Sequence, residues 1–147
     1  MDCVFCKIVS GEIPCFKVWE NDSFLAFLDV NPNTVGMTLV VPKKHFESNV
    51  FEMSDKEFSD FCVASKKVAG LLKKKLRVER VALVMEGLGV NHAHAKLYPL
   101  HGLGKEFVNS ESKERVFFDE YPGYLTTKLG PQADFSKLKE LAEKIRS

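Results

Sequence analysis

The residues best suited to chemistry lie in the run Asn91-His-Ala-His-Ala-Lys-Leu-Tyr98. Alternate side chains of a β-strand share a face, so a strand here would carry His92, His94 and Lys96 on one face and the alanines between them on the other. Packing alone gives no reason to align two imidazoles and an ammonium, whereas anion binding, metal ligation and phosphoryl transfer all use these groups. The alternative is a polar outer face that happens to be basic.

A second candidate group is the Cys-x-x-Cys pair formed by Cys3 and Cys6. Two thiolates at this spacing suit zinc, which needs two further ligands, and the chain has 4 histidines to supply them. Inert thiols and a redox pair are the alternatives. The redox alternative lacks the strand that usually precedes such a motif.

The composition favours a single globular domain. Hydrophobic residues make up 45% and charged residues 28% of the 147 residues, which is the balance of a folded protein rather than of a disordered tail. The net charge of +1 predicts no broad basic face for duplex nucleic acid. We expect no membrane span and no secretory signal, and therefore a protein of the cytoplasm, with the nucleus as a second location.

Strands dominate the elements that are expected to position these groups. Short β-like runs are predicted at residues 17–20, 24–29, 37–41, 80–86, 92–98 and 116–118. Short helical turns are expected over 3–10 and a last helix over 135–145. Ser54 and Glu57 form a capping box that opens the longest helix, whose apolar stripe runs to about Leu76 and needs a sheet to bury it. The pattern predicts an α+β fold.

Together these segments resemble the histidine triad (HIT) family, of the zinc-containing type. The resemblance is carried by Cys3-Val-Phe-Cys-Lys-Ile-Val-Ser-Gly-Glu-Ile-Pro14, Leu25-Ala-Phe-Leu-Asp-Val-Asn-Pro32, Gly36-Met-Thr-Leu-Val-Val-Pro-Lys-Lys-His45 and the modified motif His92-Ala-His-Ala-Lys96. It implies a five-stranded antiparallel sheet with two main helices, in a subunit that often forms a homodimer. We therefore expect a HIT-like domain over residues 1–104, and a C-terminal extension with a helix over 105–147 that packs on the same domain.

The resemblance also implies an activity and its residues. HIT proteins are nucleotide-binding hydrolases and transferases, and the middle histidine of their motif, here His94, attacks the α-phosphorus of a nucleoside monophosphate derivative to form a nucleotidyl-histidine. Lys96 replaces the third motif histidine and would act as a point charge on the phosphate. Structural zinc would be held by Cys3, Cys6, His45 and His92, with no position left for water.

The family's nucleoside-binding positions fall on Val4, Phe5, Ile8, Phe27, Asp29 and Val30. Asp29 would accept the ribose hydroxyls, because a carboxylate can take two donors. The alternatives are ordinary core positions for the apolar residues, a turn residue for Asp29 and a surface histidine for His45.

Several positions near the phosphate depart from the family pattern. Besides Lys96, these are Met37, Met85 and the short turn over residues 87–91. Because such positions ordinarily contact phosphate or orient the nucleophile, their loss slows turnover. The alternative function is therefore a catalytically weakened nucleotide-binding or scaffold protein of the same fold.

Overall fold

The computed structural model describes residues 2–146, which divide into two compact units with the boundary between Phe107 and Val108. The elements in chain order are α1 (Val4–Val9), β1 (Lys17–Glu20), β2 (Phe24–Leu28), β3 (Thr38–Pro42), the 3₁₀ helix η1 (Val50–Glu52), α2 (Asp55–Leu76), β4 (Val81–Val84), β5 (Ala95–Pro99) and α3 (Phe135–Arg146).

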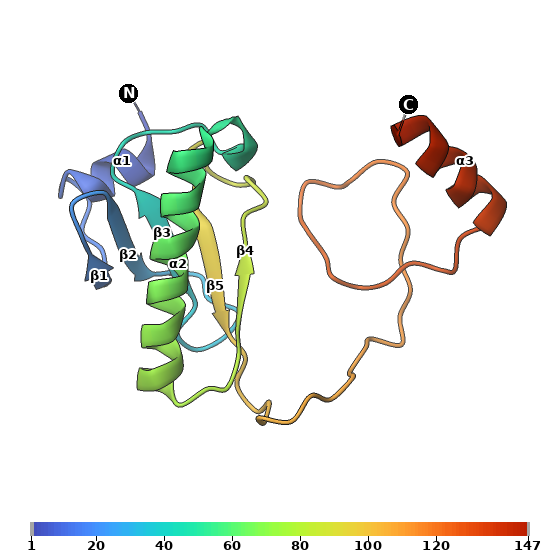
Figure 1. The fold of residues 1–147 in the computed structure, drawn as a ribbon. Coiled ribbons are helices and arrows are strands. Elements are labelled where there is room, and N and C mark those ends of the chain that lie inside the picture. The colour runs from blue at the N-terminus through green and yellow to red at the C-terminus, as the bar shows by residue number, and fades with distance from the viewer. Residues whose placement is uncertain (1, 147) are drawn as a thin grey trace. The chain divides into compact units, whose positions relative to one another are not determined.

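The strands form one antiparallel sheet in the order β1-β2-β3-β5-β4 (Figure 1). This confirms the predicted α+β fold with a five-stranded antiparallel sheet. Side chains alternate along β2: Phe24 and Ala26 belong to one apolar cluster, and Leu25 and Phe27 belong to another. The sheet therefore buries apolar side chains on both faces and needs a covering layer on each.

The long helix α2 covers one face of the sheet. Its predicted capping box is present, because Ser54 accepts from the Glu57 N–H while the Glu57 carboxylate accepts from the Ser54 N–H. The apolar stripe of the helix packs against β2, β3 and β5, and the ring of Phe61 stacks on that of Phe24 with centroids 5.6 Å apart.

The short helix α1 covers the other face, where Phe5 packs in the same cluster as Leu39 of β3. Leu39 is the register partner of Lys96, so Lys96 points to the α1 face. Ala95 and Leu97 belong to the cluster under α2. The predicted division of β5 into a polar face and an apolar face is thus correct for these residues.

Several predicted strands differ from the structure: β4 covers Val81–Val84 of the predicted 80–86, and the largest differences are at residues 92–98 and 116–118. β5 begins at Ala95, so His92 and His94 precede the strand, because the Ala93 N–H donates to the Phe46 carbonyl of a loop, at 2.9 Å, rather than to a strand. Residues 116–118 form no strand in the described chain. Val116 donates one backbone hydrogen bond, of 3.0 Å to Leu129, and no ladder follows it.

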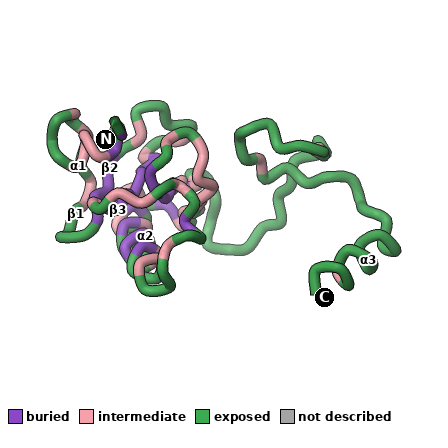
Figure 2. Tube along the Cα trace, turned by 90° about the horizontal axis from the view of Figure 1, so that it is seen from above, coloured by how far each residue is buried: buried purple, intermediate pink, exposed green. Residues whose placement is uncertain are grey.

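The C-terminal unit consists of an irregular segment followed by α3, the predicted last helix. Figure 2 shows exposed residues along almost all of it. The domain limits at residues 104 and 105, and the packing of the extension on the first domain, stay predictions. None of the helices within residues 2–146 has the length and apolar character of a membrane span.

Candidate active site and metal centre

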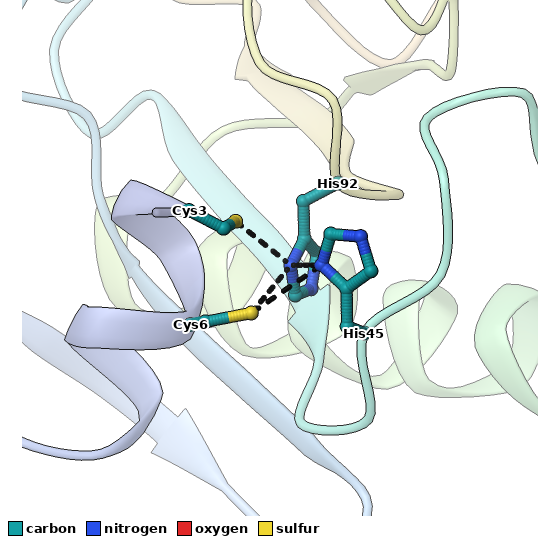
Figure 3. Close-up of side chains that lie close together, drawn as sticks. All are labelled: Cys3, Cys6, His45 and His92. Carbon is teal, nitrogen blue, oxygen red and sulfur yellow. Dashed lines mark hydrogen bonds between the residues drawn. The ribbon is translucent and has the colours of Figure 1, made fainter. Parts of the chain in front are cut away.

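Four side chains from three distant segments converge beside α1: Cys3, Cys6, His45 and His92 (Figure 3). Each offers one ligand atom, and these atoms all lie within 4.8 Å of one another. The Cys6 Sγ is 3.3 Å from Nδ1 of His45 and 3.5 Å from Nδ1 of His92. The Cys3 Sγ is 3.4 Å from Nδ1 of His92, and the two Nδ1 atoms are 3.2 Å apart.

These separations fit a tetrahedral cation. Metal–sulfur bonds of about 2.3 Å and metal–nitrogen bonds of about 2.0–2.1 Å place sulfur and nitrogen ligands roughly 3.5 Å apart, and two nitrogen ligands roughly 3.3 Å apart. The three sulfur–nitrogen distances given above and the nitrogen–nitrogen distance agree with these values. The four predicted ligands could therefore hold a metal ion.

His92 is held in the tautomer that ligation requires. The ring is fully buried, and its Nε2 donates to the Pro42 carbonyl at 2.9 Å, so the lone pair lies on Nδ1 among the other ligand atoms. Burial lowers the pKa of His92, which keeps the ring neutral. Burial also raises the pKa of the Cys6 thiol, and a bound cation would favour its thiolate.

Phe5 of α1 joins this group to a second site. Its ring meets the ring of His92 edge-on, with centroids 5.8 Å apart, and that of His94 at 5.5 Å. It also meets Phe27 of β2 at 5.8 Å. Because Cys3 and Cys6 flank Phe5 in the chain, whatever holds the cysteines in place also positions this ring.

A cavity of about 420 Å³ lies on the α1 face of the sheet, bounded by α1, β2 and the turn at residues 88–90. It is lined by all of the predicted nucleotide-binding and catalytic residues: Val4, Phe5, Ile8, Phe27, Asp29, Val30, His94 and Lys96. The structure thus brings the predicted site together in one pocket. The role of each residue stays a prediction.

His94 has one ring nitrogen free for chemistry. Its Nδ1 lies 2.7 Å from the backbone carbonyl of His92, which can only accept, so Nδ1 donates and Nε2 keeps its lone pair. The side chain is 2% exposed but lines the pocket, so a molecule must enter the pocket to reach it. A nitrogen in this state is a potential nucleophile.

Two charged residues share the pocket wall with His94. The ammonium of Lys96 forms an ion pair with Oε1 of Glu86. The carboxylate of Asp29 accepts from the Asn31 N–H at 2.7 Å, in a local turn that fixes its orientation and leaves acceptor capacity on the carboxylate.

The turn before His92 is held by the neighbouring loop. Gly87 has φ 71°, and a Cβ there would lie 2.8 Å from the Ser48 carbonyl oxygen, so the position requires glycine. Asn91 accepts from the Ser48 N–H at 3.0 Å. The departure from the family pattern at residues 87–91 is therefore a turn with its own supports, which presents residues 88–90 to the pocket.

Comparison with known sequences agrees with this geometry. Residues 10–103 match the family model of the HIT domain. The chain belongs to the HIT family. The predicted family and fold are thereby confirmed.

The relatives of this HIT protein come from distant organisms. The adenosine 5′-monophosphoramidase of Schizosaccharomyces pombe is 47% identical over 147 residues, which cover 100% of this chain and 98% of the relative. An uncharacterised HIT-like protein of Methanocaldococcus jannaschii is 42% identical over 123 residues, covering 80% and 94%. The crystal structure of a HIT family member from Bacillus subtilis has a TM-score of 0.69 at 29% identity, covering 99% and 96%. These comparisons support the prediction of a nucleotide-binding hydrolase.

Sequence reasoning missed some residues of the pocket region of this HIT protein. Cys15, Leu39 and the turn at 88–90 line the pocket, and Glu86 pairs with its lysine. Glu86 stood at the end of a predicted strand, and that position was a usable signal. To infer from that position that Glu86 meets Lys96, one must know that Val84 is the register partner of Lys96. The sequence alone does not provide this register.

Proposed function

We propose that this HIT protein hydrolyses nucleoside 5′-monophosphate derivatives, above all nucleoside phosphoramidates, through a covalent intermediate on His94. The observation that carries the proposal is the free Nε2 of His94 in a pocket that also contains Lys96 and Asp29. The activity named for the fission-yeast relative supports the choice of substrate.

The pocket offers a place for each part of such a substrate. The apolar wall formed by Val4, Phe5, Ile8 and Phe27 would hold the base, with Val30 at the exposed rim. Asp29 would accept the ribose hydroxyls, and the α-phosphate would lie between His94 and Lys96. The volume of about 420 Å³ lies within the usual range for small-molecule sites.

The reaction has two displacements at phosphorus. In the first, Nε2 of His94 forms a bond to phosphorus while the phosphorus–nitrogen bond of the substrate breaks, and the departing amine takes up a proton. In the second, water or another acceptor attacks phosphorus, its proton is lost, and the bond to Nε2 breaks to release the nucleoside monophosphate. Lys96 offsets the negative charge of the phosphate oxygens in both steps.

The metal group would bind zinc with a structural role. Cys3, Cys6, His45 and His92 would complete a tetrahedral shell, so zinc there would hold α1 in place and keep Phe5 at the pocket. Metal analysis of protein purified without added metal should give about one equivalent of zinc per chain. A Cys3→Ser protein with full metal content would contradict the ligand set.

A homodimer and a cytoplasmic or nuclear location complete the proposal. β4 lies at an edge of the sheet with Leu83 partly exposed, which leaves a strand edge for a second copy to extend. Light scattering would measure the mass in solution, and imaging of the tagged protein would test the location. The net charge of +1 predicts no binding of duplex nucleic acid.

Mass spectrometry during turnover tests the activity. With adenosine phosphoramidate, dinucleoside polyphosphates and nucleotide sugars as candidates, we expect a nucleotidyl adduct on His94 that is absent from His94→Ala. His101→Ala is the matched control, because His101 is exposed and bonds to the Val35 carbonyl outside the pocket. Tight nucleotide binding with neither adduct nor turnover would favour the catalytically weakened alternative.

A further inference from the structure

A buried carboxylate lies behind the lysine of the pocket. β4 ends at Val84, the register partner of Lys96, and Glu86 follows two residues later. Oε1 of Glu86 forms an ion pair with the Lys96 ammonium, and the Glu86 side chain is 10% exposed. The second oxygen, Oε2, is buried and has no hydrogen-bond partner within residues 2–146.

This ion pair differs from the others in the described chain. The carboxylates of those pairs are all at least 34% exposed, so water completes their hydrogen bonding. Glu86 loses most of its hydration and leaves one oxygen unpartnered, which is costly for stability. A buried polar atom without a partner needs an explanation other than stability. Here the explanation is the effect of Glu86 on Lys96, which lines the pocket.

The pocket wall has little surplus positive charge. Among the described residues that line it, Lys96 carries a positive charge and Asp29 a negative one, while Glu86 balances Lys96 from behind. Lys96 and Glu86 form an ion pair, and Lys96 and Asp29 line the same pocket, so all three carry charge at or next to the site. Burial is the main cause that raises the pKa of Tyr98, Lys96 lowers it, and Glu86 and Asp29 raise it further. A phosphate that enters can still bind the Lys96 ammonium, but Glu86 balances that charge, so little positive charge is left over for a second anionic group.

We propose that Glu86 is a positioning residue that sets the leaving-group specificity of the pocket. It holds the Lys96 ammonium beside the α-phosphate and cancels the positive charge that a second anionic group would need. The inference rests on the proposed function, since it concerns the group that departs from phosphorus. The pocket should accept amines, which depart neutral once they have taken up a proton, and should disfavour sulfate or further phosphate, which depart as anions.

The test uses two substrates that share the adenosine 5′-monophosphate group. Adenosine 5′-phosphoramidate releases ammonia, and adenosine 5′-phosphosulfate releases sulfate. The quantity measured is kcat/KM for the sulfate substrate divided by kcat/KM for the amidate, with the full chain at fixed pH and ionic strength. In Glu86→Gln the amide oxygen still accepts from Lys96 but the charge is gone, so we expect this ratio to rise by roughly 10- to 100-fold.

Matched variants separate specificity from folding. Glu86→Asp keeps the charge and should keep a ratio close to the wild-type one. Lys96→Gln leaves the Glu86 carboxylate without a compensating charge, so the ratio of sulfate to amidate turnover should fall. This variant still tests the role of Glu86 if Glu86→Gln does not fold. Glu20→Gln removes an exposed carboxylate paired with two lysines away from the pocket and should leave the ratio unchanged.

The outcomes distinguish the inference from the function on which it rests. A folded Glu86→Gln protein with the wild-type ratio, or a rise in the ratio for Lys96→Gln, overturns the role of Glu86 and leaves the proposed hydrolysis intact. Wild-type protein that turns over neither substrate, or turnover that survives in His94→Ala, contradicts the proposed function itself.

Discussion

His92 and His94 lie two residues apart and are both buried, yet the structure leaves opposite nitrogens available. Nε2 of His92 donates to the Pro42 carbonyl, which leaves Nδ1 among the ligand atoms of the metal group. Nδ1 of His94 donates to the His92 carbonyl, which leaves Nε2 for the pocket. In both cases a backbone carbonyl decides which nitrogen carries the proton.

The surroundings of the two rings then set their chemistry. His92 lies among sulfur and nitrogen donors that would complete a closed coordination shell, which suits a structural metal. His94 lies on the wall of a cavity beside Lys96, which suits attack on an anionic substrate. Phe5 contacts both rings, so the two regions differ in chemistry but are mechanically connected.

The variant His94→Ala should give the largest effect, and it tests whether the pocket and the metal group have separate roles. We expect kcat for the amidate substrate to fall on the order of 10⁴-fold or more, because the nucleophile is lost. The metal content should change little, since His94 is not one of the metal ligands. Rapid-quench kinetics and metal analysis of the same preparation measure both quantities. If the variant also lost its metal, the proposed separation of the two regions would be wrong.

Cys3→Ser should disrupt the metal group while leaving the nucleophile His94 in place. Loss of a ligand should release the metal and lower the free energy of unfolding by about 4 kcal/mol, measured by chemical denaturation. KM should rise because α1 is less firmly held, while the adduct on His94 still forms at saturating substrate. Cys62→Ser, in α2 and outside the metal group, is the control and should retain the metal. Loss of the adduct from Cys3→Ser at saturating substrate would contradict a purely structural metal.

Much of this arrangement was predictable because it depends on local patterns or on a family resemblance. The capping box at Ser54 is encoded within four residues, and the structure has it. The metal group came from matching Cys3, Cys6, His45 and His92 to family positions, and the structure brings all four together. The Cys-x-x-Cys spacing alone had left zinc, redox chemistry and inert thiols open.

What the sequence could not predict depends on contacts between distant segments. The alternation of residues 92–98 left a polar outer face open as the alternative to a functional one, but the structure buries both histidines. β5 begins at Ala95 because Ala93 bonds to Phe46 of a loop. The pairing of Glu86 with Lys96 likewise follows from strand register, which no local pattern specifies.

Asp29→Asn tests the predicted contact between the pocket and the ribose hydroxyls of the substrate. Loss of a charged acceptor for the ribose hydroxyls should raise KM roughly 10- to 100-fold with little change in kcat. Asparagine can still accept from the Asn31 N–H, so the local turn should survive. For an analogue of the amidate substrate that lacks both ribose hydroxyls, KM should be the same in the wild type and in the variant. Asp22→Asn, in an exposed turn outside the pocket, is the control, and an equal rise in KM there would argue against a specific ribose contact.

The smallest expected effect comes from Phe5→Leu, which tests the mechanical connection between the two regions. The edge-on contacts to His92 and His94 would be lost, at a cost of about 0.5–1.5 kcal/mol, and both metal affinity and nucleotide affinity should fall modestly. Phe24→Leu is matched to it, because each phenylalanine is 7% exposed and Phe24 stacks on Phe61 under α2 instead. Isothermal titration with metal and with a nucleoside monophosphate, alongside thermal unfolding, would compare the two variants. Equal losses of stability with weaker binding in Phe5→Leu alone would place the coupling at this ring, whereas equal losses of binding in both variants would assign it to general destabilisation.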